Sequence, residues 1–150
     1  MKIYIILVAI AVAAAFLPVE LFISEAPRPP PDKIVTPGGI LAVSTTPLWL
    51  YTWRATVATV ALLFAAIVAT FFIKPNQKAR KTLIALSTLA ALFHYLTLLF
   101  TSQPPGYGIS IYPLFFTITI NGTTQYYLDI GQIFLIYAFY NFYKIRKKLL

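Results

Sequence analysis

The chain has 150 residues, of which 59% are hydrophobic and only 11% are charged. Soluble domains carry roughly 25% charged residues, and a water-soluble fold of this size could not bury so much apolar surface. The composition therefore indicates an all-α integral membrane protein, expected in the cell membrane as a multi-pass protein surrounded by lipid. Cysteine is absent, which excludes disulfides, thiolate metal sites and a cysteine nucleophile.

Four apolar runs predict four transmembrane helices in a single domain. They cover about 3–23, 48–73, 82–101 and 128–144. A membrane span needs ~20 apolar residues, range roughly 17–25, so the fourth run is marginal. The first run could instead be a signal peptide with Lys2 as its basic end. Its long uninterrupted apolar stretch favours a retained helix, which Pro18 should kink or end near the outer side.

The basic residues predict how these helices are oriented. Most of them lie at the N-terminus, between the second and third runs, and after the fourth run. They are Lys2, Lys74, Lys78, Arg80, Lys81, Lys144, Arg146, Lys147 and Lys148. Basic loops stay cytoplasmic, so we expect both termini inside. The net charge of +8 suits anionic lipid headgroups. Binding of nucleic acid is not expected, because no basic face is interleaved with base-stacking aromatics.

Two segments are expected outside the membrane. The segment 24–47 is proline-rich and is predicted to be an extended loop without a core. In the segment 114–128 an Asn-Gly dipeptide begins at Asn121, between two β-favouring runs. This is the strongest short-range signal for a β-hairpin, because a type I′ turn needs positive φ at both central residues. In that register Ile120 pairs with Thr123. Asn121 also starts a glycosylation sequon on the outer side.

His94 is the only histidine, and it lies within the third apolar run. Its neighbours on a helix are small or carry a hydroxyl, which places it on a packing face and not toward lipid. These neighbours are Ser87, Ala90, Ala91, Thr97 and Thr101. We expect a neutral imidazole that forms a hydrogen bond with Ser87, Thr97 or a facing hydroxyl. A functional role is the alternative, because ionisable groups within a span often mark a site.

Arg54 lies at the outer end of a similar stripe in the second run. The stripe consists of alanines three or four residues apart, which let two helices approach closely. They are Ala58, Ala61, Ala65 and Ala69. With Glu20, His94, Asp129 and Gln132, Arg54 forms a candidate polar cluster in one outer layer. Purely structural roles are the alternative: Arg54 would reach up to the headgroups, and Asp129 would cap the fourth helix.

The sequence contains no recognisable catalytic, cofactor-binding or metal-binding motif. A metal centre needs a cluster of suitable ligands, and a haem held inside a bundle usually needs two histidines. The G-x-S-x-G and HEXXH motifs and the phosphate-binding glycine loops are also absent. We therefore expect that this chain is not an enzyme by itself and binds no cofactor, although it could belong to an enzyme complex.

The small-residue faces and the outer segments favour contact with other chains. We expect a non-catalytic accessory subunit of a larger membrane protein complex. By analogy with small aromatic-rich subunits, a respiratory-chain or other energy-transducing assembly in electron transport is expected. The predicted contact residues are Ala61, Ala65, Ala69, Ser87, Ala90 and Ala91. One alternative is a small transporter or channel whose polar site is formed by Arg54 and His94. Another is an enzyme or quinone-site protein that acts from the outer leaflet.

Overall fold

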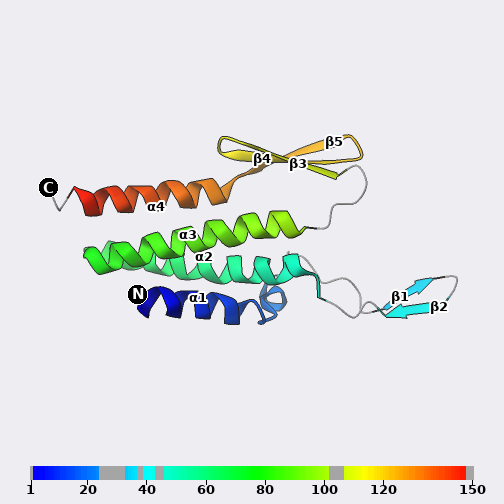
Figure 1. Ribbon diagram of the computed structural model, residues 1–150, viewed down its shortest axis with the longest axis horizontal. Coiled ribbons are helices and arrows are strands. Elements are labelled where there is room, and N and C mark those ends of the chain that lie inside the picture. The colour runs from blue at the N-terminus through cyan, green and yellow to red at the C-terminus, as the bar shows by residue number, and fades with distance from the viewer. Residues whose placement is uncertain (1, 24–32, 37–38, 43–45, 102–106, 148–150) are drawn as a thin grey trace.

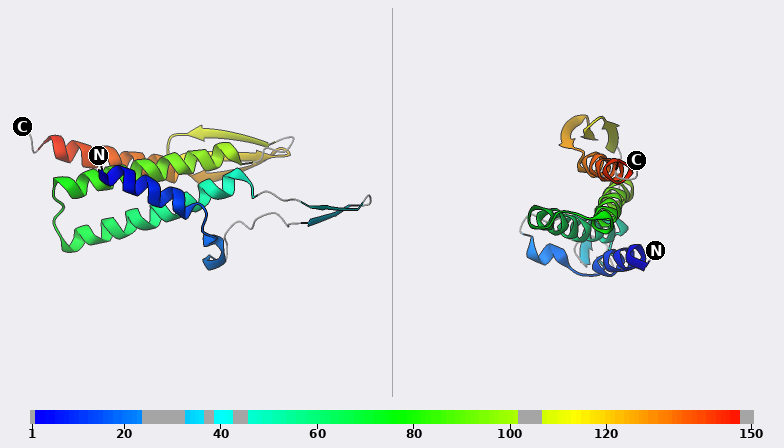
Figure 2. Two further views of the ribbon diagram at one scale, coloured as in Figure 1. Left: turned by 60° about the horizontal axis from the view of Figure 1, so that its bottom comes forward. Right: turned by 90° about the vertical axis from the view of Figure 1, so that its left-hand side faces the viewer.

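The computed structural model describes residues 2–23, 33–36, 39–42, 46–101 and 107–147. Within these residues, four α-helices run alternately in opposite directions and form the body of the protein (Figure 1). They are α1 (Lys2–Ala14), α2 (Leu48–Phe72), α3 (Gln77–Phe100) and α4 (Ile130–Arg146). α3 packs against each of the other three helices. α1 and α4 lie on opposite sides of the α2–α3 pair (Figure 2).

Two of these helices, α2 and α3, are long and apolar enough to cross a membrane. With 25 and 24 residues, each exceeds the ~30 Å of a hydrocarbon core at ~1.5 Å per residue. α1 and α4 are shorter, with 13 and 17 residues.

The predicted first helix, 3–23, is longer than the helix in the structure. α1 ends at Ala14, and a short 3-10 helix, η1 (Val19–Phe22), follows it. Pro18 has no backbone N–H that could continue the helical ladder to the carbonyl of Ala14, and a proline also disfavours helical conformation in the residue before it. Pro18 therefore ends the helix well before the apolar run is over.

The helices meet around a small apolar core. Leu63 of α2 and Leu83 and Leu86 of α3 are buried there, and residues of α1 and α4 pack on them. Ser87, Ala90 and Ala91 are almost fully buried, so this predicted contact face is covered by helices of the same chain. The other predicted contact residues, Ala61, Ala65 and Ala69, are exposed on the surface of α2.

A three-stranded antiparallel sheet precedes α4 in the chain. It consists of β3 (Tyr107–Tyr112), β4 (Phe115–Ile120) and β5 (Thr123–Leu128), with β4 in the middle. The predicted hairpin is confirmed: Ile120 lies opposite Thr123, and Asn121 and Gly122 have φ values of 49° and 82°. The sheet lies beside the last turns of α3, on the same side as α4 (Figure 1). β3 was not predicted from the sequence.

One face of this sheet is turned toward the helices. Phe116 of β4 is only 6% exposed, and its ring stacks on Tyr127 of β5. Burial raises the pKa of Tyr107, and the neighbouring Tyr127 acts in the same direction. The opposite face carries Tyr112, Phe115 and other exposed side chains. The Phe116 face is covered only in part, because Ile111, Ile120 and Tyr127 on it are 56%, 46% and 41% exposed. The opposite face is free within the described chain, apart from the buried Thr117.

Part of the predicted outer loop, 24–47, also forms strands. β1 (Lys33–Thr36) and β2 (Gly39–Ala42) are antiparallel, with Ile34 opposite Leu41. The sequence analysis did not predict these strands, in which β-branched residues such as Ile34 and Val35 are favoured. Residues 24–32, which contain most of the prolines of this segment, lie outside the described residues.

Candidate functional site

α4 begins directly against α3 because Gly131 has no side chain. A Cβ atom at this position would lie 2.7 Å from Cδ2 of His94 and 3.0 Å from the ring of Tyr95. Carbon atoms normally approach to about 3.5–4.0 Å, so any larger residue would push the two elements apart. Neither Gly131 nor Tyr95 was predicted as a site residue from the sequence.

Asp129 lies at this contact and caps α4, as one of the two interpretations of the sequence predicted. Its carboxylate accepts hydrogen bonds from the backbone N–H of Gln132 at 3.1 Å and from the Gln132 side-chain amide at 2.9 Å. The hydroxyl of Tyr95 lies 3.1 Å from both carboxylate oxygens. Asp129 is fully buried, so these donors replace the water that the carboxylate loses on folding. The helix begins at Ile130 and not at 128, because the cap stands outside it.

Gln132 connects the same helix end to the sheet. Its side-chain carbonyl accepts from the backbone N–H of Leu114 at 2.9 Å, and its amide donates to the carbonyl of Tyr112 at 2.7 Å. The backbone N–H of Asp129 donates to the carbonyl of Leu114 at 2.9 Å. Leu114 has a φ of 67°, which is uncommon for a residue with a side chain. These hydrogen bonds hold the turn between β3 and β4 in that conformation.

His94 packs in the same place but lacks a hydrogen bond. Its Nε2 atom lies 3.6 Å from Oδ1 of Asp129, too far for a hydrogen bond, and it is buried without a partner. The expected bond to Ser87 or Thr97 is not formed, because each of these hydroxyls donates to a carbonyl of its own helix. Ser87 and Thr97 therefore share the packing face with His94 but form no hydrogen bond with its ring.

A groove with a volume of about 670 Å³ opens beside His94. Its walls are residues of α2 between Trp53 and Phe64, residues of α3 between His94 and Leu98, and Ile130 at the start of α4. Most of these side chains are apolar, and the polar ones are Thr56, His94 and Thr97. The Thr56 hydroxyl in the wall already donates to a backbone carbonyl. His94 thus places an unsatisfied polar ring on the border of an apolar space.

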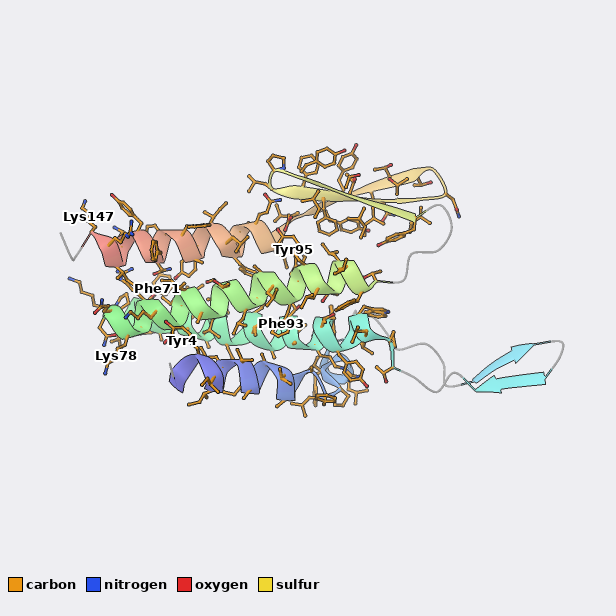
Figure 3. All side chains as sticks on the ribbon, viewed as in Figure 1. Tyr4, Phe71, Lys78, Phe93, Tyr95 and Lys147 are labelled. Atoms are coloured by element: carbon orange, nitrogen blue, oxygen red, sulfur yellow. The ribbon has the colours of Figure 1, made fainter. Side chains whose placement is uncertain are left out.

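The remaining predicted site residues lie in other parts of the fold. Arg54 lies on the inner face of α2, 8% exposed, with its guanidinium 5.7 Å from the centre of the Tyr51 ring. Glu20 belongs to η1, and its side chain lies outside the described part of the structure. Asn121 is exposed at the hairpin turn; its glycosylation stays a prediction. The structure therefore joins His94, Asp129 and Gln132 of the predicted cluster and adds Tyr95 to them. Tyr95 is labelled in Figure 3.

The arrangement is suited to hydrogen bonding and not to metal binding. In the described ranges, no three His, Asp or Glu residues come together in a way that could hold a metal ion. An imidazole beside a carboxylate can donate a hydrogen bond to a molecule in the groove or accept one from it. No protein-family model matches the chain, and comparison with curated proteins and with solved structures finds no similar protein.

Proposed function

We propose that this protein spans the membrane four times with both ends in the cytoplasm. The alternating helix directions support this, because the N-terminal end of α1, the C-terminal end of α4 and the connection between α2 and α3 share one end of the molecule (Figure 1). Basic side chains such as Lys78 and Lys147 lie at that end, and both sheets lie toward the other (Figure 3). Short spans such as α1 and α4 are accommodated by local thinning of the bilayer.

Within that topology, the protein is a non-catalytic accessory subunit of a larger membrane complex. The free face of the β3–β5 sheet is the observation that carries this proposal. Tyr112 and Phe115 stack there at 4.9 Å, and Phe115 and Tyr126 lie 6.0 Å apart. All three are exposed, Tyr126 by 73%. Contiguous exposed apolar surface of this kind marks an interaction site.

Lipid alone is a poor cover for this sheet. β3 and β5 are each paired on one side only in the described residues, so the sheet has two open edges beside the last turns of α3. Unpaired backbone groups cannot face hydrocarbon, and the aromatic face is too apolar for water. A second protein chain can satisfy both requirements. By analogy with other small hydrophobic subunits, an energy-transducing assembly is the class we propose.

The test is whether the aromatic face holds the protein in a larger assembly. A tagged chain is solubilised in mild detergent and its size is measured on native gels. Tyr126→Ala should shift the chain out of a large species, whereas Tyr143→Ala should not, because Tyr143 is comparably exposed, at 61%, but lies at the other end of α4. A wild-type chain that is monomeric, stable and active in liposomes would favour the transporter interpretation instead.

A further inference from the structure

We propose that the groove between α2 and α3 binds a neutral lipophilic phenol, the class that includes the reduced isoprenoid quinones, and that His94 accepts the hydrogen bond of its hydroxyl. Three observations carry this proposal: the orientation of the His94 ring, the absence of basic residues from the groove lining, and the size and character of its walls. The proposal does not depend on the partner proposed above.

The His94 ring presents one edge to α4 and the other edge away from it. Its Cδ2 atom is the one that a Cβ on Gly131 would strike, and its Nε2 atom faces Asp129 at 3.6 Å. In an imidazole, Nδ1 stands on the other side of the ring from this Nε2–Cδ2 edge. The Asp129 carboxylate, 3.6 Å from Nε2, favours the tautomer with the proton on Nε2 by electrostatic attraction, without a hydrogen bond, and Nδ1 is then an acceptor. A ligand hydroxyl that donates to Nδ1 matches this arrangement.

The charge around the groove selects a neutral ligand. The residues that line it in the described structure include neither Lys nor Arg, so nothing there would balance a phosphate or a fatty-acid carboxylate. The Asp129 carboxylate behind His94 repels anions further, because the repulsion between like charges is weakly screened in a low-dielectric site. An uncharged hydrogen-bond donor therefore fits better than a phospholipid headgroup.

The walls favour a ring with an apolar body. Trp53 and Phe64 contribute aromatic surface to the lining, and Val57, Val60 and Leu98 contribute aliphatic surface. The volume of about 670 Å³ lies within the roughly 300–1,000 Å³ of small-molecule sites. A substituted phenol can place its ring against these walls while its hydroxyl reaches His94.

The experiment measures thermal unfolding of the tagged full-length chain in isolated native membranes, so that any natural partner remains bound. The probes are 2,3,5,6-tetramethylphenol and its methyl ether, which have nearly the same shape but differ in the hydroxyl donor. A ligand that binds the folded state raises its unfolding temperature. The phenol should raise the unfolding temperature at concentrations about 3- to 10-fold lower than those the ether requires, because one additional hydrogen bond strengthens binding by about that factor.

Two pairs of variants localise the effect. His94→Leu should abolish the preference for the phenol, while His94→Asn should retain part of it, because the Asn side-chain oxygen stands near the position of Nδ1. Ala61→Phe should fill the groove and abolish the response to both probes. Ala65→Phe is the matched control, since Ala65 is also exposed on α2 but does not line the groove.

The proposal is overturned if wild-type protein responds equally to the phenol and the ether, because the groove would then be a general site for hydrocarbon chains. A phenol preference that survives in His94→Leu would also overturn it. So would an unchanged response in Ala61→Phe, which alters an exposed position and leaves the helix interior intact.

Discussion

Gly131 is the residue at which α4 meets His94 and Tyr95. In an open helix, Gly→Ala usually stabilises by up to ~1 kcal/mol. Here the added methyl would lie 2.7 Å from His94 Cδ2, and overpacking of this kind costs about 1–3 kcal/mol. We therefore predict that Gly131→Ala lowers the free energy of unfolding by about 1–2 kcal/mol, measured by denaturant unfolding in one membrane mimetic. Gly108→Ala is the control, because a Cβ there meets no atom within 4 Å; equal stability of the two variants would contradict the tight contact.

Tyr95 supplies a hydrogen bond to a fully buried carboxylate. Hydrogen bonds to charged groups contribute about 1.5–3 kcal/mol, compared with about 0.5–1.5 kcal/mol for neutral pairs. Tyr95→Phe should therefore destabilise the wild type by about 1.5–3 kcal/mol, and by clearly less in the Asp129→Asn background. A double-mutant cycle of unfolding free energies measures this difference. Tyr140→Phe, at an exposed position of α4, should have no effect. Additive costs at Tyr95 and Asp129 would mean that the two side chains are not coupled.

Among the secondary-structure elements, the sheet is the one that combines a predicted and an unpredicted part. The β4–β5 hairpin follows from the Asn-Gly turn between two β-favouring runs, which acts over a few neighbouring residues. The β3–β4 turn contains Pro113 and Leu114, and Leu114 adopts a positive φ that usually requires Gly or Asn. Pro113 suits the second position of such a turn, but Leu114 disfavours the third, and the turn is held by the N-terminal end of α4 from outside the sheet.

The connection between sheet and helix can be tested through Gln132. Gln132→Leu removes both side-chain hydrogen bonds to the β3–β4 turn. We predict that the amide of Leu114 then exchanges its hydrogen faster by about tenfold or more, since ~1.4 kcal/mol of lost protection corresponds to a factor of ten. Gln125→Leu is the control, because Gln125 lies in β5 and bonds to Tyr127 of the same strand. Similar exchange rates in the two variants would show that Gln132 does not hold the turn.

For the whole molecule, the helix directions and the basic residues make one prediction about topology. Reporter fusions at Gln77 and after the C-terminus should give a cytoplasmic signal, and fusions at Pro30 and Gly106 an external one. The reason is that basic segments are retained on the cytoplasmic side. Matched reporters active only inside or only outside the cell provide the control. An internal signal at Pro30 would contradict a membrane-spanning α1 and favour other interpretations of the first apolar run.

A hydrogen bond at the basic end of the bundle also joins α3 to α4. Arg80, near the start of α3, donates to the side-chain carbonyl of Asn141 at 3.2 Å. The amide of Asn141 donates to the backbone of Tyr137, and Asn141 is only 1% exposed. α3 and α4 are thus joined at one end through Arg80 and Asn141 and at the other through Tyr95 and Asp129. We missed Asn141 in the sequence because a polar residue in an apolar run has no visible partner there.

The sequence by itself determined the two long apolar helices and the hairpin with its register, and it offered the cap of α4 as one of two roles for Asp129. These features depend on apolar run length and on turn and capping chemistry, which act between residues close in the chain. Only the tertiary structure decided which helix faces pack inside: the Ser87 face is covered, and the Ala61 face is exposed. It also decided that Tyr95 reaches Asp129 while His94 stays unpaired beside a groove. Tyr95 and Asp129 are 34 positions apart, and their contact requires the absent side chain of Gly131, so no local pattern could show it.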